Sequence, residues 1–325
     1  NELKNKNVTF HLEGAYMNTE VYVNSHKVGE HHHGYTGAAF DITKYLNTDG
    51  KTRNVIAVRT ENKVPTSRWY SGSGIYRDVN LMVTDKLHVD HYGVKIEANN
   101  LEENHESTVT TTVKTTVINN HEEAKDFTVE VRLLDKDGQQ VANVQSDSLK
   151  IEAGQSIIEN LEFNVETPTL WSIDNPYLYK VETLIKTNDT IIDRVVNDFG
   201  YRFFKFDADE GFSLNGKNMK LKGVNMHHDQ GAVANPAAME RQVQILKKMG
   251  ANAIRTSHNP VSPALIDIAN RYGVLVIEES FDGWHRAKNG NVNDYSNYFD
   301  QAIGEENEII HGRSDMTWAE YDLKE

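Results

Sequence analysis

The last third of the chain alternates between short apolar runs and amphipathic stretches with helical spacing. Strands are predicted at residues 219–225, 251–255 and 274–279. The first helix between them is predicted to begin at Pro236, behind the capping residue Asn235, and to end before Gly250. Its expected apolar face carries Met239, Val243, Leu246 and Met249. A second helix is predicted from residue 263, and two βα units in series indicate a parallel sheet or barrel.

The preceding residues alternate with the two-residue period of β-strands. Strands at residues 8–12, 19–23, 40–43 and 54–58 predict a jelly-roll β-sandwich over residues 1–86. The alternation of Phe127, Val129, Val131 and Leu133, with a turn at Asp137-Gly138, predicts an immunoglobulin-like β-sandwich over residues 87–199. Residues 200–325 would then hold the α/β part, which opens with a hairpin at Asn215-Gly216.

The predicted fold class is therefore multidomain, with two β-sandwiches followed by the first βα units of a TIM (β/α)8 barrel. A complete barrel needs about 250 residues, and the residues after 211 supply less than half of that length. The absence of an initiator Met and the strand pattern close to residue 1 suggest an internal fragment.

Composition narrows the classes of partner. The 325 residues carry a net charge of -14, which argues against nucleic acid and against anionic membrane surfaces. Without cysteine there are no disulfides and no thiolate metal sites. No apolar run approaches the roughly 18 residues of a membrane helix, and the sequence does not determine a compartment.

Each predicted strand of the last third is followed by ionisable or aromatic side chains. His227 follows the first strand, Arg255 ends the second strand with His258 in the loop after it, and Asp282 and Trp284 follow the third. In parallel α/β folds ligands bind at the carboxyl ends of strands, so these five residues are candidate binding residues. We expect Arg255 to pair with a carboxylate, and a carboxylate beside an indole resembles a sugar subsite.

Two adjacent acidic residues end the third predicted strand. Glu278 and Glu279 are neighbours in sequence, so their side chains point to opposite sides of an extended segment. One of them is expected to face the core or a helix. We therefore do not expect them to act as a catalytic pair.

An aromatic loop in the first domain has two interpretations. Arg68, Trp69, Tyr70 and Tyr76 cluster around glycines within residues 67–79. Aromatic faces beside an arginine suit a sugar, because CH groups pack on the rings and the guanidinium donates to hydroxyls. The alternative is an aromatic core loop, in which Arg68 is the member hardest to bury without a partner.

Metal and phosphate sites are the rival chemistries. His31, His32 and His33 are consecutive, so on a strand they cannot converge on one ion, and a polar turn or strand edge is expected. His227, His258 and a carboxylate could form a two-histidine metal site, but no local ligand spacing supports one. No glycine-rich loop follows the first predicted strand of the α/β part, which argues against phosphate or dinucleotide binding.

Five motifs together resemble glycoside hydrolase family 2. They are residues 68–79, residues 168–179, GVNMHHD at 223–229, NAIRTSHNP at 252–260 and the EESFDGW run from residue 278. The order implied by the resemblance is jelly roll, immunoglobulin-like sandwich and (β/α)8 barrel. The motifs are most similar to those of the family's β-galactosidases, and β-glucuronidases share much of the scaffold.

The resemblance implies a retaining mechanism with two glutamates, an acid/base and a nucleophile, whose carboxyl groups lie about 5–5.5 Å apart. Both are expected beyond Glu325, because Asn307-Glu308 does not follow an apolar strand. No catalytic residue is therefore expected within this chain, which alone would be inactive. His227 and His258 would bind sugar hydroxyls, and Arg255 would hold the nucleophile's charge. Arg68, Asp282 and Trp284 would complete the pocket.

One departure from the family pattern concerns magnesium. Metal-dependent members place a Glu and a His shortly after the third strand, where this chain has Gly283 and His285. We therefore expect no cofactor, and a magnesium site is doubtful.

The expected partner is a β-galactoside oligosaccharide or glycan, with neither nucleic acid nor a membrane span. The open barrel edge suggests a possible homo-oligomer. The alternatives are a β-glucuronidase-type hydrolase and a non-catalytic carbohydrate-binding protein.

Overall fold

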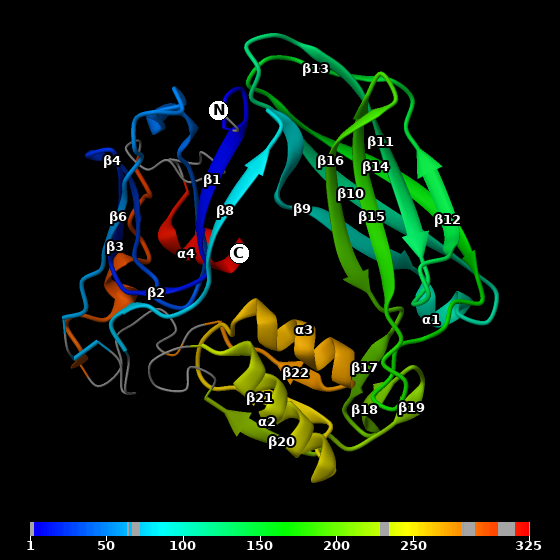
Figure 1. Ribbon diagram of the computed structural model, residues 1–325. Coiled ribbons are helices and arrows are strands. Elements are labelled where there is room, and N and C mark those ends of the chain that lie inside the picture. The colour runs from blue at the N-terminus through cyan, green and yellow to red at the C-terminus, as the bar shows by residue number, and fades with distance from the viewer. Residues whose placement is uncertain are drawn as a thin grey trace. The chain divides into compact units, whose positions relative to one another are not determined.

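The chain folds into two compact units, each made of segments that are distant in sequence (Figure 1). The computed structural model describes residues 3–63, 65–66, 72–227, 234–280, 282, 290–304 and 316–324. Unit 1 comprises Asn1–Val83, Gly223–Ala269 and Val276–Glu325, and unit 2 comprises Thr84–Lys222 and Asn270–Leu275. None of the helices in the described ranges combines the length and hydropathy needed to cross a bilayer.

The first 83 residues of unit 1 form the predicted jelly-roll sandwich. Its sheets have the strand orders β5-β1-β8 and β4-β3-β6, with a short β2-β7 pair beside them. The strands are β1 (Asn7–Leu12), β2 (Ala15–Tyr16), β3 (Thr19–Val23), β4 (His26–His31), β5 (Ala38–Asp41), β6 (Ile56–Arg59), β7 (Gly74–Ile75) and β8 (Val79–Thr84), with a 3-10 turn η1 (Thr43–Tyr45). β3 buries every second residue, as the alternation predicts.

The jelly-roll core is completed by residues from the far end of the chain. Val21, Phe40 and Ile42 are fully buried in one cluster with Trp318 and Tyr321. These two aromatic residues lie on helix α4 (Trp318–Lys324), which follows the 3-10 turn η3 (Tyr295–Tyr298). The sandwich therefore depends on a segment that is outside its own sequence range.

His31 ends β4, an edge strand of its sheet as the sequence predicted, but the histidine segment is more buried than a polar edge. His31 and His33 are 3% and 1% exposed, and a nitrogen of each ring lies within 3.1 Å of the hydroxyl of Thr36. His32 points the other way and stacks on Tyr298, with ring centroids 4.1 Å apart. The strand alternation that prevents one shared ion also places two of the rings inside the core.

Unit 2 is built around the predicted immunoglobulin-like sandwich. Its sheets have the orders β14-β10-β9 and β12-β11-β15-β16, and β13 pairs with β11. The elements are β9 (Leu87–Asn99), α1 (Leu101–Asn104), β10 (Thr108–Asn119), β11 (Lys125–Leu134), β12 (Gln140–Gln145), β13 (Leu149–Ile151), β14 (Ser156–Glu166), β15 (Tyr179–Thr187) and β16 (Thr190–Phe199). The alternating residues from Phe127 to Leu133 are at most 2% exposed, which confirms the predicted inward face.

A small hairpin follows the sandwich in unit 2. It comprises β17 (Phe204–Asp207), β18 (Gly211–Leu214) and β19 (Lys217–Asn218). Asn215 and Gly216 join β18 to β19 with φ values of 50° and 73°. Two positive φ values in succession are the signature of a type I′ turn, so the turn predicted from Asn-Gly is confirmed.

The α/β part has the predicted order of strands and helices. The elements are β20 (Gly223–Met226), α2 (Pro236–Lys248), β21 (Ala253–Thr256), α3 (Pro263–Tyr272) and β22 (Leu275–Ile277). They form one sheet of order β20-β21-β22, in which β20 and β21 are parallel. Three strands with two intervening helices are the start of a TIM barrel, as predicted.

The bounds of all three strands, and the burial of one residue of the predicted apolar face of α2, differ from the predictions. The first strand begins at Gly223, four residues later than predicted, because its ladder starts where Gly223 meets Ala253 of β21. On α2, Met239 and Val243 are buried as predicted, but Met249 is 73% exposed. Met249 is the C-cap of α2, so it lies beyond the turns that pack on the sheet. The N-cap prediction is confirmed, since the Asn235 side chain accepts from the amides of Ala237 and Ala238.

We expect the buried histidines to make unit 1 sensitive to acid. Burial lowers the pKa of His11 to about 4 and that of His31 to about 3, whereas an unfolded histidine titrates near about 6.5. The unfolded chain binds more protons, so this stability is complete above about pH 6.5 and is lost as the pH falls toward the folded-state values. Each such histidine should make the free energy of unfolding about 1 kcal/mol lower at about pH 5.5 than at about pH 7.5. Urea titrations at the two pH values measure this difference.

Two variants separate this effect from the titration of other groups. His31→Asn should remove about 1 kcal/mol of the difference between the two pH values, because the side chain that takes up the proton is gone. The exposed residue His26 is the control, and His26→Asn should leave the difference unchanged. A His31→Asn variant with the wild-type pH dependence would contradict the prediction.

Candidate functional site

Polar side chains from all three strands of the parallel sheet meet at its carboxyl end. Arg255 lies on β21, and its guanidinium forms an ion pair with the carboxylate of Glu279, two residues after β22. The same guanidinium lies 3.3 Å from the Asn225 side-chain oxygen on β20. The Glu279 amide donates to the Thr256 hydroxyl at 3.0 Å, which fixes the backbone beside the ion pair. The carboxylate partner expected for Arg255 is thus Glu279.

The same carboxylate orients a histidine. His258 Nδ1 lies 3.0 Å from Glu279 Oε2. A carboxylate oxygen can only accept, so Nδ1 carries the proton and donates it to Glu279. The remaining nitrogen, Nε2, is then an acceptor in the neutral ring and a donor in the charged ring. The His227 ring lies edge-on to that of His258, with centroids 5.6 Å apart.

We call His227, Arg255, His258 and Glu279 the strand-end cluster. The positive charge of Arg255 and the negative charge of Glu279 balance each other. Both side chains are partly accessible to solvent, with 39% of Arg255 and 23% of Glu279 exposed. The cluster therefore presents donors and acceptors without a large net charge. Such a surface suits a neutral ligand that has many hydroxyl groups.

The loop that carries His258 is held by the jelly roll within unit 1. The buried guanidinium of Arg77 donates to the carbonyl of Pro260 at 2.7 Å and to the carbonyl of Tyr35 at 2.6 Å. One side chain thereby joins the loop after β21 to a loop of the first domain. Arg77 belongs to the aromatic motif of residues 67–79, but the sequence argument did not single it out.

Tyr76, from the same motif, packs in the core and is not part of a sugar platform. It is 9% exposed, and its hydroxyl donates to the carbonyl of Gly34 at 2.7 Å. For this residue the interpretation as an aromatic core loop holds. Arg68, Trp69 and Tyr70 lie outside the described residues, so their part in a sugar site stays a prediction.

The structure describes one of the two remaining candidate residues, Asp282, but not the other, Trp284. Asp282 is buried, with 4% of its surface exposed. Its role toward a sugar stays a prediction. Trp284 lies outside the described residues.

The adjacent acidic residues have different partners, as their opposite directions predict. Glu278 accepts from the Val261 amide at 3.0 Å, whereas Glu279 faces Arg255 and His258. Arg255 and His258 were predicted from the sequence, but Glu279 was not predicted as their common partner. The available signal was the position of Glu279 at the end of β22, next to the end of β21.

The described residues offer no assembled metal site. Within those ranges, no three His, Asp or Glu side chains converge as a ligand set. Gly283 and His285, on which the question of magnesium depends, lie outside the described residues. A glycine supplies no side-chain ligand where the metal-dependent pattern has a glutamate, so the residue type itself does not fit that site.

Three family models cover most of the chain. Residues 1–85 match the model of the glycosyl hydrolases family 2 sugar binding domain. Residues 87–202 match the model of glycosyl hydrolases family 2, and residues 208–316 match the TIM barrel domain of the same family.

Individual proteins extend this likeness. The chain is 40% identical over 294 residues to the β-galactosidase BoGH2A of Bacteroides ovatus, covering 89% of this chain and 34% of that protein. It is 30% identical over 290 residues to a β-glucuronidase of Bacteroides fragilis, covering 86% of this chain and 41% of that protein. A glycosyl hydrolase family 2 member from Bacteroides cellulosilyticus has a similar structure, with a TM-score of 0.85 and 36% identity over 92% of this chain and 38% of that one. The chain thus spans 34% and 41% of the lengths of the two curated relatives.

We expect Glu279→Gln to loosen the strand-end cluster. The glutamine amide carries no charge to balance Arg255, and it has one acceptor oxygen in place of the two that Glu279 uses. The free energy of unfolding should therefore fall by about 1 kcal/mol. The His258 ring should also lose its fixed tautomer, measured by the ¹⁵N chemical shifts of the ring nitrogens. Glu278→Gln is the matched control, since its remaining oxygen still accepts from Val261. Unchanged His258 shifts in Glu279→Gln would show that the carboxylate does not orient this ring.

Proposed function

The chain belongs to glycosyl hydrolases family 2, and from that premise we propose that it forms the sugar-recognition part of a retaining exo-glycosidase for terminal β-D-galactosides. The observation that carries the proposal is the strand-end cluster. Glu279 fixes a guanidinium and a histidine ring at the carboxyl end of a barrel sheet, which is where barrel enzymes bind substrate.

His227 and His258 would bind the hydroxyls of the sugar. Glu279 contacts His258 Nδ1, so in our proposal Nε2 is the ring atom that pairs with a sugar hydroxyl group. Because a hydroxyl can donate or accept, it can pair with Nε2 in either protonation state of the ring. Asp282 and Trp284 would complete the sugar side of the site, and Arg68 would edge it from the jelly roll.

Catalysis would come from two glutamates on barrel strands that follow β22. In a retaining enzyme one acts as acid/base and the other attacks the anomeric carbon, with carboxyl groups about 5–5.5 Å apart. Glu278 and Glu279 do not meet this need, because their carboxylates serve different partners. In our proposal Arg255 is placed to share its charge with the nucleophile. The 325 residues alone would then bind sugar without hydrolysing it, and no step of this scheme requires a metal ion.

A β-glucuronidase activity is the second candidate, because relatives with that name share the scaffold. A uronic acid needs a cation that is free to meet its carboxylate. In the strand-end cluster the charge of Arg255 is already balanced by Glu279, and the chain as a whole carries -14. Both facts favour the galactoside. Self-association through the open sheet edge stays a prediction.

The galactoside proposal predicts binding without turnover. The purified chain should bind methyl β-galactoside, and His258→Ala should weaken that binding roughly tenfold through the loss of one hydrogen bond. His26→Ala on the jelly-roll surface is the control and should leave the affinity unchanged. Binding is measured by calorimetry, and turnover with nitrophenyl β-galactoside and nitrophenyl β-glucuronide.

Each contrary result addresses one part of the proposal. Turnover by the pure chain would refute the placement of both glutamates on later strands. Binding of methyl β-glucuronide that is tighter than that of methyl β-galactoside, and that His258→Ala weakens, would reverse the order of the two substrates. An absence of binding to either sugar would refute the recognition role.

A further inference from the structure

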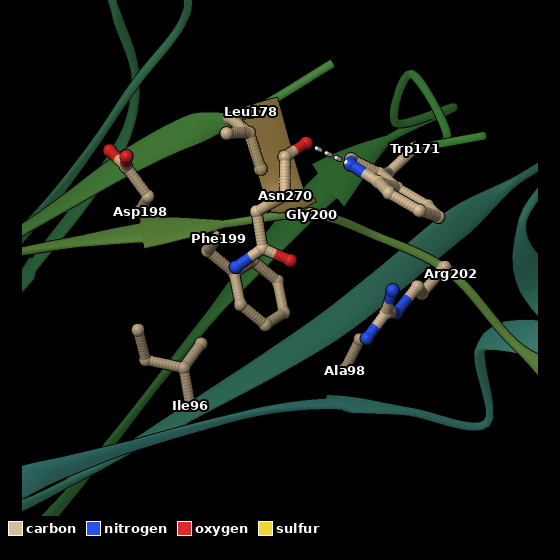
Figure 2. Close-up of a pocket in the computed structure, with 9 residues that line it drawn as sticks. All are labelled: Ile96, Ala98, Trp171, Leu178, Asp198, Phe199, Gly200, Arg202 and Asn270. Atoms are coloured by element: carbon tan, nitrogen blue, oxygen red, sulfur yellow. Dashed lines mark hydrogen bonds between the residues drawn. The ribbon is translucent and has the colours of Figure 1, made fainter. Parts of the chain in front are cut away.

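Unit 2 contains a cavity of about 350 Å³ that shares no residue with the strand-end cluster (Figure 2). Its walls come from β9, from β16, from the end of α3 and from the loops that flank β15 and β16. The lining residues are Ile96, Ala98, Trp171, Leu178, Asp198, Phe199, Gly200, Arg202 and Asn270. The volume falls in the range of about 300–1,000 Å³ that is usual for small-molecule sites.

Arg202 is the charged group that makes this cavity unusual. Its guanidinium carbon lies 4.7 Å from the centre of the Trp171 ring. In the part of the chain that the structure describes, its guanidinium has neither an ion pair nor a hydrogen bond. Burial lowers the pKa of Arg202, yet an arginine keeps its charge at any ordinary pH. Arg202 is an exposed residue, so water solvates its guanidinium, and a ligand carboxylate would exchange that water for a charge-assisted pair.

The platform beneath Arg202 is held in place. The Trp171 indole donates to the backbone carbonyl of Asn270 at 2.8 Å, and its own amide donates to the Tyr201 carbonyl at 2.8 Å. Gly200 permits this packing, because a Cβ there would lie 2.9 Å from that of Trp171. The guanidinium is therefore presented from a fixed surface, which reduces the entropy lost when a ligand binds.

The rest of the cavity combines polar and apolar groups. Figure 2 shows the Asn270 carboxamide between the aromatic side and the side that bears Asp198. Asp198 is already bound by Lys180 at 2.9 Å, so its charge is largely compensated. Ile96, Leu178 and Phe199 supply an apolar wall. A ligand that fills this space needs an anionic end, hydroxyl groups and a CH face.

We propose that this cavity binds an acidic sugar residue, with its carboxylate on Arg202, its hydroxyls toward Asn270 and Asp198, and its CH face on the apolar wall. The planar guanidinium matches a carboxylate in a bidentate pair. A neutral hexose would leave Arg202 without a counter-ion. A polyphosphate carries more negative charge than Arg202, the one cationic residue that lines the cavity, can balance. This inference does not depend on the proposed glycosidase function, so the two can fail separately.

Galacturonate and galactose provide the test, because they differ only in the carboxylate at the sixth carbon. Calorimetry on the full chain should show galacturonate binding at least tenfold more tightly than galactose. Arg202→Met should abolish this preference while its stem still packs on Trp171. Asn270→Asp is a second variant that keeps the backbone carbonyl used by Trp171. It places a carboxylate in the cavity, and galacturonate binding should fall at least tenfold.

The control is Arg194→Gln, which removes a guanidinium from the same sandwich. Arg194 pairs with Glu182 and does not line the cavity, so this variant should bind galacturonate as the wild type does. The proposal is overturned if galacturonate and galactose bind equally well. It is also overturned if galacturonate binding survives in both cavity variants. Equal affinity for acetate would replace the sugar assignment with a general anion site.

Discussion

At the carboxyl edge of the barrel sheet, one anion contacts both a cation and a histidine. Glu279 supplies that anion, and its two oxygens face Arg255 and His258 separately. Without it, the guanidinium and a protonated imidazole would repel each other in a partly desolvated site. The functional groups of β21 therefore depend on a residue from the end of the neighbouring strand. Family membership identifies the motifs, and this contact explains why they occur together.

The jelly roll contributes to this arrangement within unit 1. Arg77 is buried, and its guanidinium donates hydrogen bonds to the carbonyls of Pro260 and Tyr35. These bonds connect the loop that carries His258 to the first domain. A hydrogen bond from a charged donor in a buried setting is stronger than a neutral one. The β-domain at the start of the chain is therefore part of the support of the strand-end cluster. Family 2 enzymes with altered first domains should be examined with this link in mind.

Regular elements were predictable, and tertiary partners were not. The alternation from Phe127 to Leu133 and the Asn215-Gly216 turn depend on neighbouring residues, so the local pattern was sufficient. The burial of His31 depends on a helix close to the end of the chain, and no local pattern reports it. The pairing of Glu279 depends on which strands are adjacent. The sequence therefore identified Arg255 and His258 by type and position but not the carboxylate that joins them.

The dependence of the jelly-roll core on Trp318 and Tyr321 has a consequence for biogenesis. A ribosome releases the strands of the first domain long before it adds these two aromatic residues. Domains usually fold as units during synthesis, beginning with the first. Until then the core of the nascent sandwich lacks two of its aromatic side chains, and the contacts that complete it join residues more than 200 positions apart in the sequence. Contacts of such high sequence separation slow folding, so this chain should rely on chaperones more than its local β-pattern suggests.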